Sequence, residues 1–98
     1  MEKNSLFYMA NLDPEIGRLL SFFDSNKMEA AHNAQIRALG IVDKILSFRS
    51  EVKPAGREEW NVIKNFILGF ETLDEYERNI LEKYAQPFSY KFMKAYSG

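Results

Sequence analysis

Two residues in this sequence, Glu29 and His32, have the types and spacing that metal chemistry requires. On a helix, the Glu-x-x-His spacing places a carboxylate and an imidazole on one face, where a helical bundle can bind metal ions. A complete di-metal site needs two such motifs and two further glutamates, but the sequence contains a single histidine. We therefore expect His32 to be a partly buried residue with one hydrogen bond, and we expect no bound metal.

The sequence also lacks the residues that usually carry out nucleophilic catalysis. The sequence has no cysteine, and no serine stands near His32 in the spacing of a recognisable triad. Glu71 and Asp74 could offer two carboxylates to a magnesium ion, but a predicted helix start separates them. The helix dipole explains Asp74 without a cation. The sequence therefore predicts a protein that is not an enzyme and has no cofactor.

The last sixteen residues alternate lysines with aromatic residues, a combination that can stack on bases and neutralise phosphates. Residues 83–98 contain Lys83, Lys91 and Lys94, no arginine and no acidic residue. The whole chain has a net charge of -1, so no overall field attracts nucleic acid. Aromatic residues at this spacing more often pack in a core or an interface, beneath lysine stems. Nucleic-acid binding by this tail is therefore the weakest of three functional hypotheses.

Aromatic residues make up 14% of the sequence, a high proportion for a small helical domain. Because such a domain cannot bury all of them, some should lie in an interface or in a pocket. Aromatic side chains anchor protein interfaces because they bury a large area and have few torsions to freeze. The leading hypothesis is a homodimeric helical module that binds a protein partner through an aromatic and aliphatic face. Its candidate residues are Trp60, Phe66, Phe70, Tyr76 and Tyr84.

The alternative hypothesis is that these aromatic residues line a cavity between the helices, which would hold a small apolar or aromatic ligand. His32, Tyr8 or Tyr76 would then be the polar group that orients the ligand. The two hypotheses predict different surfaces. A ligand binder needs a large enclosed apolar cavity, whereas an interaction module needs an exposed apolar face or groove.

The length of 98 residues indicates a single domain over residues 1–98, with a modest margin of stability. The absence of cysteine excludes a disulfide framework and a thiolate zinc site. No apolar run is long enough to span a bilayer, and the first residues do not fit a signal peptide. We therefore expect a soluble, cytoplasmic protein with no membrane contact.

Periodic apolar residues and capping signals predict an all-α fold, a small bundle of about four main helices. The predicted helices span residues 14–24, 27–50, 57–70 and 73–86. The second is the longest, so we expect the others to pack along it. The terminal segments, residues 1–12 and 88–96, could be short helices or extended, and helix is favoured for both.

Local signals place the starts of the first two helices. Asp13 and Pro14 fit the cap and the first position of a helix. Asn26 and Glu29 fit a capping box that opens the long helix. The short turn between these helices predicts an antiparallel hairpin.

Similar signals delimit the second half of the chain. Residues 51–56 contain a proline and a glycine and are expected to form a loop. Thr72 and Glu75 fit a second capping box, which predicts the start of the last main helix. Pro87 is expected to end or kink that helix.

Overall fold

The structure is a computed structural model that describes residues 4–48 and 54–96, with side chains described for 4–48, 54–84, 86 and 87. Within these ranges it contains four α-helices, one short 3-10 helix and no strand. The predicted all-α bundle of four main helices is therefore confirmed. The elements are α1 (Ser5–Asp24), α2 (Met28–Ser47), α3 (Pro54–Leu68), the 3-10 helix η1 (Phe70–Thr72) and α4 (Glu75–Tyr96).

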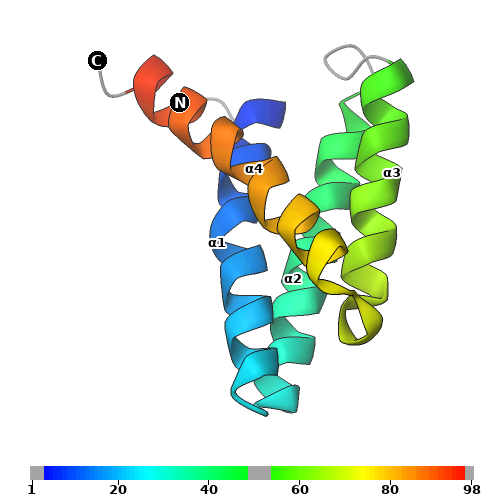
Figure 1. Ribbon diagram of the computed structural model, residues 1–98. Helices are drawn as coiled ribbons and strands as arrows, with labels where there is room; N and C mark the ends of the chain where they lie inside the picture. The colour runs from blue at the N-terminus through cyan, green and yellow to red at the C-terminus, as the bar shows by residue number, and fades with distance from the viewer. Residues whose placement is uncertain (1–3, 49–53, 97–98) are drawn as a thin grey trace.

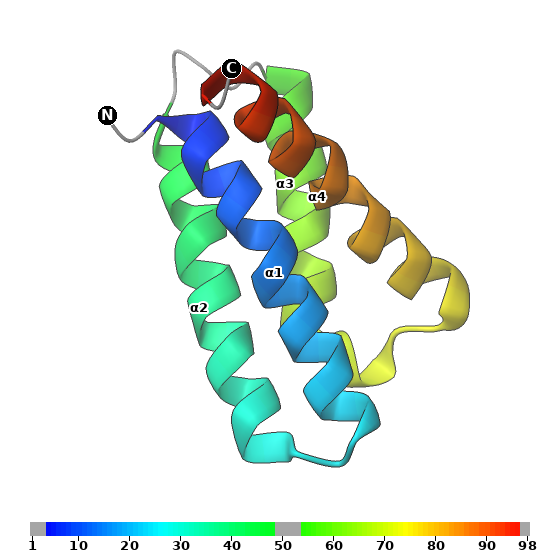
Figure 2. The same cartoon turned by 90° about the vertical axis from the view of Figure 1, so that its left-hand side faces the viewer.

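Helices α1 and α2 form an antiparallel hairpin, as Figures 1 and 2 show, and α3 and α4 pack against it. Helix α3 packs on α2, whereas α4 crosses α1 (Figure 1). Two helices, α1 and α2, therefore support the other two. The prediction that all other helices pack along residues 27–50 was too simple. The buried face of α2 is built largely from alanines, which let the neighbouring helices approach closely. The core comprises Leu12, Ile16, Leu19, Leu20, Ala31, Ala34, Ala38, Val42, Ile45, Trp60, Ile63, Ile67, Phe70 and Leu81.

Helix α1 begins nine residues earlier than the predicted start at Pro14. The Asn4 side chain caps it by accepting a hydrogen bond of 3.0 Å from the Phe7 N–H. Pro14 lies inside the helix, so the predicted cap at Asp13 was wrong. The physical reason is burial, because Leu12 continues the apolar stripe of residues 16 and 19 and is fully buried. That burial offsets the cost of an interior proline.

The turn between α1 and α2 uses Asn26 differently from the prediction. Asn26 has a φ of 60°, in the left-handed region that asparagine tolerates better than most residues. The Lys27 N–H bonds to the Phe22 carbonyl at 2.8 Å, and the Asn26 N–H bonds to the Phe23 carbonyl at 3.0 Å. This is a Schellman motif that ends α1. Asn26 therefore does not cap α2, which begins at Met28 after Lys27 with no side-chain cap.

Helix α3 starts at Pro54, so the predicted loop over residues 51–56 is wrong for residues 54–56. The first half of that predicted loop, residues 51–53, falls outside the described residues. Proline suits a first helical position, where its missing N–H costs nothing.

Helix α4 has a capping box two residues after the predicted one. The Asp74 carboxylate accepts from the Glu77 N–H at 2.7 Å, and the Asp74 N–H donates to Glu77 Oε1 at 3.0 Å. Thr72 instead donates its hydroxyl to the Gly69 carbonyl at 3.1 Å.

Pro87 does not end α4, which continues to Tyr96 and includes the segment predicted as a separate terminal helix. A proline at this position removes the N–H that would bond to the Lys83 carbonyl. Because Lys83 and Pro87 are both exposed, water can hydrate that carbonyl. The prediction of a helix end at residue 86 was therefore wrong.

A buried carboxylate joins the two central helices. Glu15 on α1 is 5% exposed and accepts a hydrogen bond of 2.6 Å from Arg18. Its second oxygen accepts from the Nε of Arg37 on α2. Each arginine side chain is about half exposed, so the ion pairs bridge the core edge and the solvent. A buried charge needs such partners, and here the partners fix α1 against α2.

Candidate interaction surface

The contact between α3 and α4 is organised around Tyr84 of α4. Its hydroxyl donates a hydrogen bond of 2.7 Å to Glu59 Oε2 on α3. Its ring makes a T-shaped contact with Trp60, with centroids 5.0 Å apart and an interplanar angle of 86°. Burial of the phenol is the main cause that raises the pKa of Tyr84, and the hydrogen bond to Glu59 raises it further. These contacts identify the flanks of α3 and α4 that face one another.

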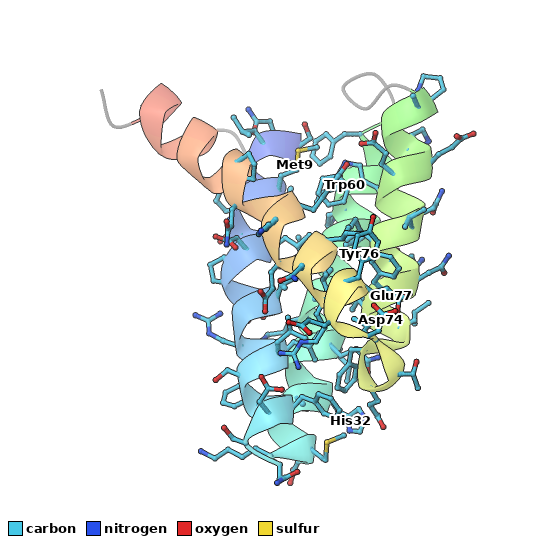
Figure 3. The ribbon with its side chains drawn as sticks, in the orientation of Figure 1. Met9, His32, Trp60, Asp74, Tyr76 and Glu77 are labelled. Carbon is cyan, nitrogen blue, oxygen red and sulfur yellow. The ribbon has the colours of Figure 1, made fainter. Side chains whose placement is uncertain are left out.

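Helical spacing places four further apolar side chains on those two flanks. Val62 and Phe66 lie three and seven residues after Glu59, and Tyr76 and Ile80 lie eight and four residues before Tyr84. Residues at these spacings share one side of a helix. Figure 3 shows Tyr76 on the side of α4 that is turned toward α3. We call this surface the α3–α4 face; it consists of Val62, Phe66, Tyr76, Ile80 and Tyr84.

The α3–α4 face changes from buried to exposed across its width. Phe66, Ile80 and Tyr84 are partly buried and pack against the core. Val62 is 48% exposed and Tyr76 is 74% exposed. The surface therefore presents a large aromatic side chain to solvent beside apolar neighbours that the core holds in place.

The five candidate residues from the sequence divide into two groups. Trp60 and Phe70 are buried in the core, with 2% and 1% of their surface exposed. Phe70 makes edge contacts with Phe23 and His32, at centroid distances of 5.4 and 5.7 Å. Phe66, Tyr76 and Tyr84, the other three candidates, share the α3–α4 face. Val62 and Ile80 were not among the candidate residues predicted from the sequence, although the same helical spacing indicates both.

His32 makes one hydrogen bond, between its Nε2 and Glu71 Oε1 at 3.1 Å, with both side chains about half exposed. The ring also lies against Phe70, and it therefore helps to join α2 to η1. No group of three or more His, Asp or Glu side chains that could hold a metal occurs in the described part of the chain. Tyr8 belongs to another cluster, where its ring contacts Phe7 and Phe48 at 5.2 and 5.8 Å.

The described residues include two surface hollows that lie outside the α3–α4 face. One of about 430 Å³ is at the start of α2, and it is lined by Lys27, Met28, Glu29, Ala30 and Asn33. The other, of about 160 Å³, lies between α1 and α4, and it is lined by Asp13, Ile16, Gly17, Glu82 and Gln86. Both linings include charged residues, and neither includes the candidate residues for orienting a ligand. They differ from the enclosed apolar cavity that the ligand hypothesis requires.

A second pair of exposed apolar residues borders α2 and α3 on another side of the molecule. Ile36 is 65% exposed and Leu68 is 53% exposed. Gln35 donates to the Ile67 and Leu68 carbonyls at 3.0 and 3.2 Å, which satisfies the end of α3. A Lys64–Asp43 ion pair of 2.9 Å also joins these helices. Polar contacts therefore already join α2 and α3 at this boundary, which we call the seam of α2 and α3.

No family model, curated protein or solved structure matches this chain. No helix in the described ranges is long and apolar enough to cross a membrane. Among the side chains that the structure describes, Tyr76 on the α3–α4 face is the most exposed aromatic residue, and its neighbours on this face pack against the core.

Proposed function

We propose that this chain is a non-enzymatic helical interaction module that binds a protein through the α3–α4 face. The first partner that we propose is a second copy of the chain, which gives a homodimer, and we propose a cytoplasmic location. One observation carries the proposal, the 74% exposure of Tyr76 beside four other apolar residues from two helices. A polar side chain at this position would avoid the cost of leaving an aromatic ring in water.

The neighbours of Tyr76 support this proposal because they are already ordered. Tyr84 is held by Glu59 and Trp60, while Phe66 and Ile80 pack against the core. A partner that covers this face would therefore freeze few additional side-chain torsions. Burying one exposed aromatic side chain of this kind contributes roughly 1.5–3 kcal/mol. The face has the composition of an interface centre, which is aromatic and aliphatic with polar residues at its rim.

Self-association of purified protein tests the proposal. Native mass spectrometry should show an assembly of at least two chains of 11.4 kDa, and sedimentation equilibrium should give its Kd. Tyr76→Ala should raise the dimer Kd by about tenfold or more, because it removes an anchor at the centre of the face. Ile36→Ala is the matched control, since Ile36 is similarly exposed but lies on another side of the molecule.

Circular dichroism and urea unfolding should show that both variants keep the fold, because both side chains are largely exposed. An Ile36→Ala chain that dissociates while Tyr76→Ala remains dimeric would place the contact at the seam of α2 and α3. A Tyr76→Ala chain that binds as well as wild type would refute the proposed face.

A further inference from the structure

The surface around the α3–α4 face is acidic. Residues 54–82 contain three bases and seven acids. All three bases are engaged with α1 or α2. Arg57 donates to the Leu46 carbonyl at 2.8 Å, Lys64 pairs with Asp43 at 2.9 Å, and Arg78 makes two bonds to Asp24 at 2.7 and 2.8 Å. The positive charges of this segment therefore point away from the α3–α4 face.

Several of the acids border the face directly. Glu58 lies four residues before Val62 and is exposed, and Glu75 is the exposed neighbour of Tyr76. Glu59 reaches Tyr84 itself. Lys83 is the one base that helical spacing places at this rim within the described side chains, seven residues after Tyr76. An apolar face with an acidic rim favours a partner segment that is apolar and basic.

The chain itself contains a segment with those properties. Residues 83–98 carry three lysines, no acid and several aromatic residues. Helix α4 runs unbroken through Pro87 to Tyr96. In Figure 1 the C-terminal half of α4 and the start of α3 lie on opposite sides of the molecule. Because α4 is continuous, its basic half cannot fold back onto the acidic segment of its own chain.

We propose that the occupant of the α3–α4 face is the basic C-terminal half of α4 from a second copy of the chain. This inference rests on the proposed function and specifies its partner. In a two-fold dimer the same contact occurs twice, because each copy offers one acidic face and one basic segment. Two antiparallel α4 helices satisfy this arrangement, since the acidic start of each then lies beside the basic end of the other.

Complementary charge reversal tests this pairing in the full-length chain. The first variant, Lys91→Glu with Lys94→Glu, makes the C-terminal segment acidic. The second variant, Glu58→Lys with Glu75→Lys, makes the rim of the face basic. Each variant alone places like charges together, so its dimer Kd should rise by about tenfold or more. An equimolar mixture should form a one-to-one heterodimer with an affinity near that of wild type, because both reciprocal contacts are then complementary.

Native mass spectrometry distinguishes the heterodimer from either homodimer, because the two variants differ in mass. Circular dichroism should confirm the fold of each chain; if the second variant loses helicity, Glu58→Lys alone replaces it. The wild-type dimer should also weaken as salt is raised from low ionic strength, because salt screens exposed charges beyond about 10 Å at 0.1 M.

Three outcomes would overturn the inference. Charge-reversed chains that dimerise as tightly as wild type would show that the basic segment is not the occupant. Weakened variants that the mixture does not restore would exclude the reciprocal pairing, and a monomeric wild type would exclude a second copy. If Tyr76→Ala abolishes association while charge reversal does not, the proposed face remains and only its occupant is wrong. If neither change matters, the proposed function fails as well.

Discussion

Replacing Pro14 with alanine should stabilise this protein. Pro14 lies inside α1, where it cannot donate the backbone hydrogen bond that the Ala10 carbonyl would normally accept. Its ring is exposed, so the replacement removes little buried surface. Alanine restores the N–H and has the highest helix propensity. The substitution therefore tests whether α1 is one continuous helix.

The expected size of the gain follows from the position of Pro14 within the helix. An interior proline costs about 3 kcal/mol relative to alanine in isolated helices. Proline also stiffens the unfolded chain, which offsets roughly 0.4–1 kcal/mol of that cost, and a folded protein adjusts locally around the ring. We expect Pro14→Ala to raise the free energy of unfolding by about 1–3 kcal/mol, from the restored hydrogen bond and the relieved clash.

Urea unfolding, followed by circular dichroism of the helices, measures this change. Pro54→Ala is the matched control, because Pro54 is also exposed but is the first residue of α3. Its replacement should change stability by less than about 0.5 kcal/mol. A continuous α1 would be contradicted if Pro14→Ala gave no gain and Asp13→Ala cost about 1 kcal/mol. That combination is expected for a helix that starts at Pro14 with Asp13 as its cap.

Three further predictions concern groups that the fold encloses. Glu15→Gln should lower the free energy of unfolding by about 1–3 kcal/mol, because it weakens a buried partner of Arg37; a urea series that shows no loss would contradict this. Trp60→Ala should lower the free energy of unfolding by about 3–5 kcal/mol in the same assay, because the side chain is buried in the core. An unchanged free energy of unfolding would show that Trp60 is not a core residue. The raised pKa of Tyr84 means that its stabilising contribution is complete below the ordinary phenol value of 10.0 and is lost as the pH rises above it. Wild-type stability, measured by urea unfolding at stepped alkaline pH, should therefore fall above about pH 10, and Tyr84→Phe should fall less steeply.

The fold class could be predicted from the sequence because apolar periodicity is strong in each helix. By helical spacing Ala31, Ala34, Ala38 and Val42 form one apolar arc of α2, and all are fully buried. The same spacing puts Ile36 off this arc, and it is 65% exposed. These assignments depend on helical spacing alone, so they did not need tertiary information.

Helix ends were less predictable because the sequence offers overlapping signals. The Thr72–Glu75 pair and the Asp74–Glu77 pair both fit a capping box. The structure uses the second pair, after η1 has buried Phe70. Local residues cannot decide between the two, since the burial of Phe70 depends on α1 and α2. The same reason explains α1, where the burial of Leu12 outweighs the break expected at Pro14.

The candidate surface was predictable in composition but not in exposure. Tyr76, Ile80 and Tyr84 form one stripe of α4 by helical spacing. In the structure exposure increases along that stripe, from a partly buried Tyr84 to a Tyr76 that is 74% exposed. How far a stripe is covered depends on where two helices contact each other. That geometry involves α1 and α2, and no local pattern encodes it.

The continuity of α4 connects the fold to the proposed partner. If Pro87 ended the helix, a short terminal segment could turn and place its lysines against the acids of residues 54–82 in the same chain. An unbroken helix prevents this, because consecutive turns advance along one axis. The part of α4 that contains Lys91 and Lys94 then remains apart from the acid-rich residues 54–82 within one molecule. They can meet only between molecules, so the feature that the sequence analysis misjudged at Pro87 is also the one that favours a reciprocal dimer.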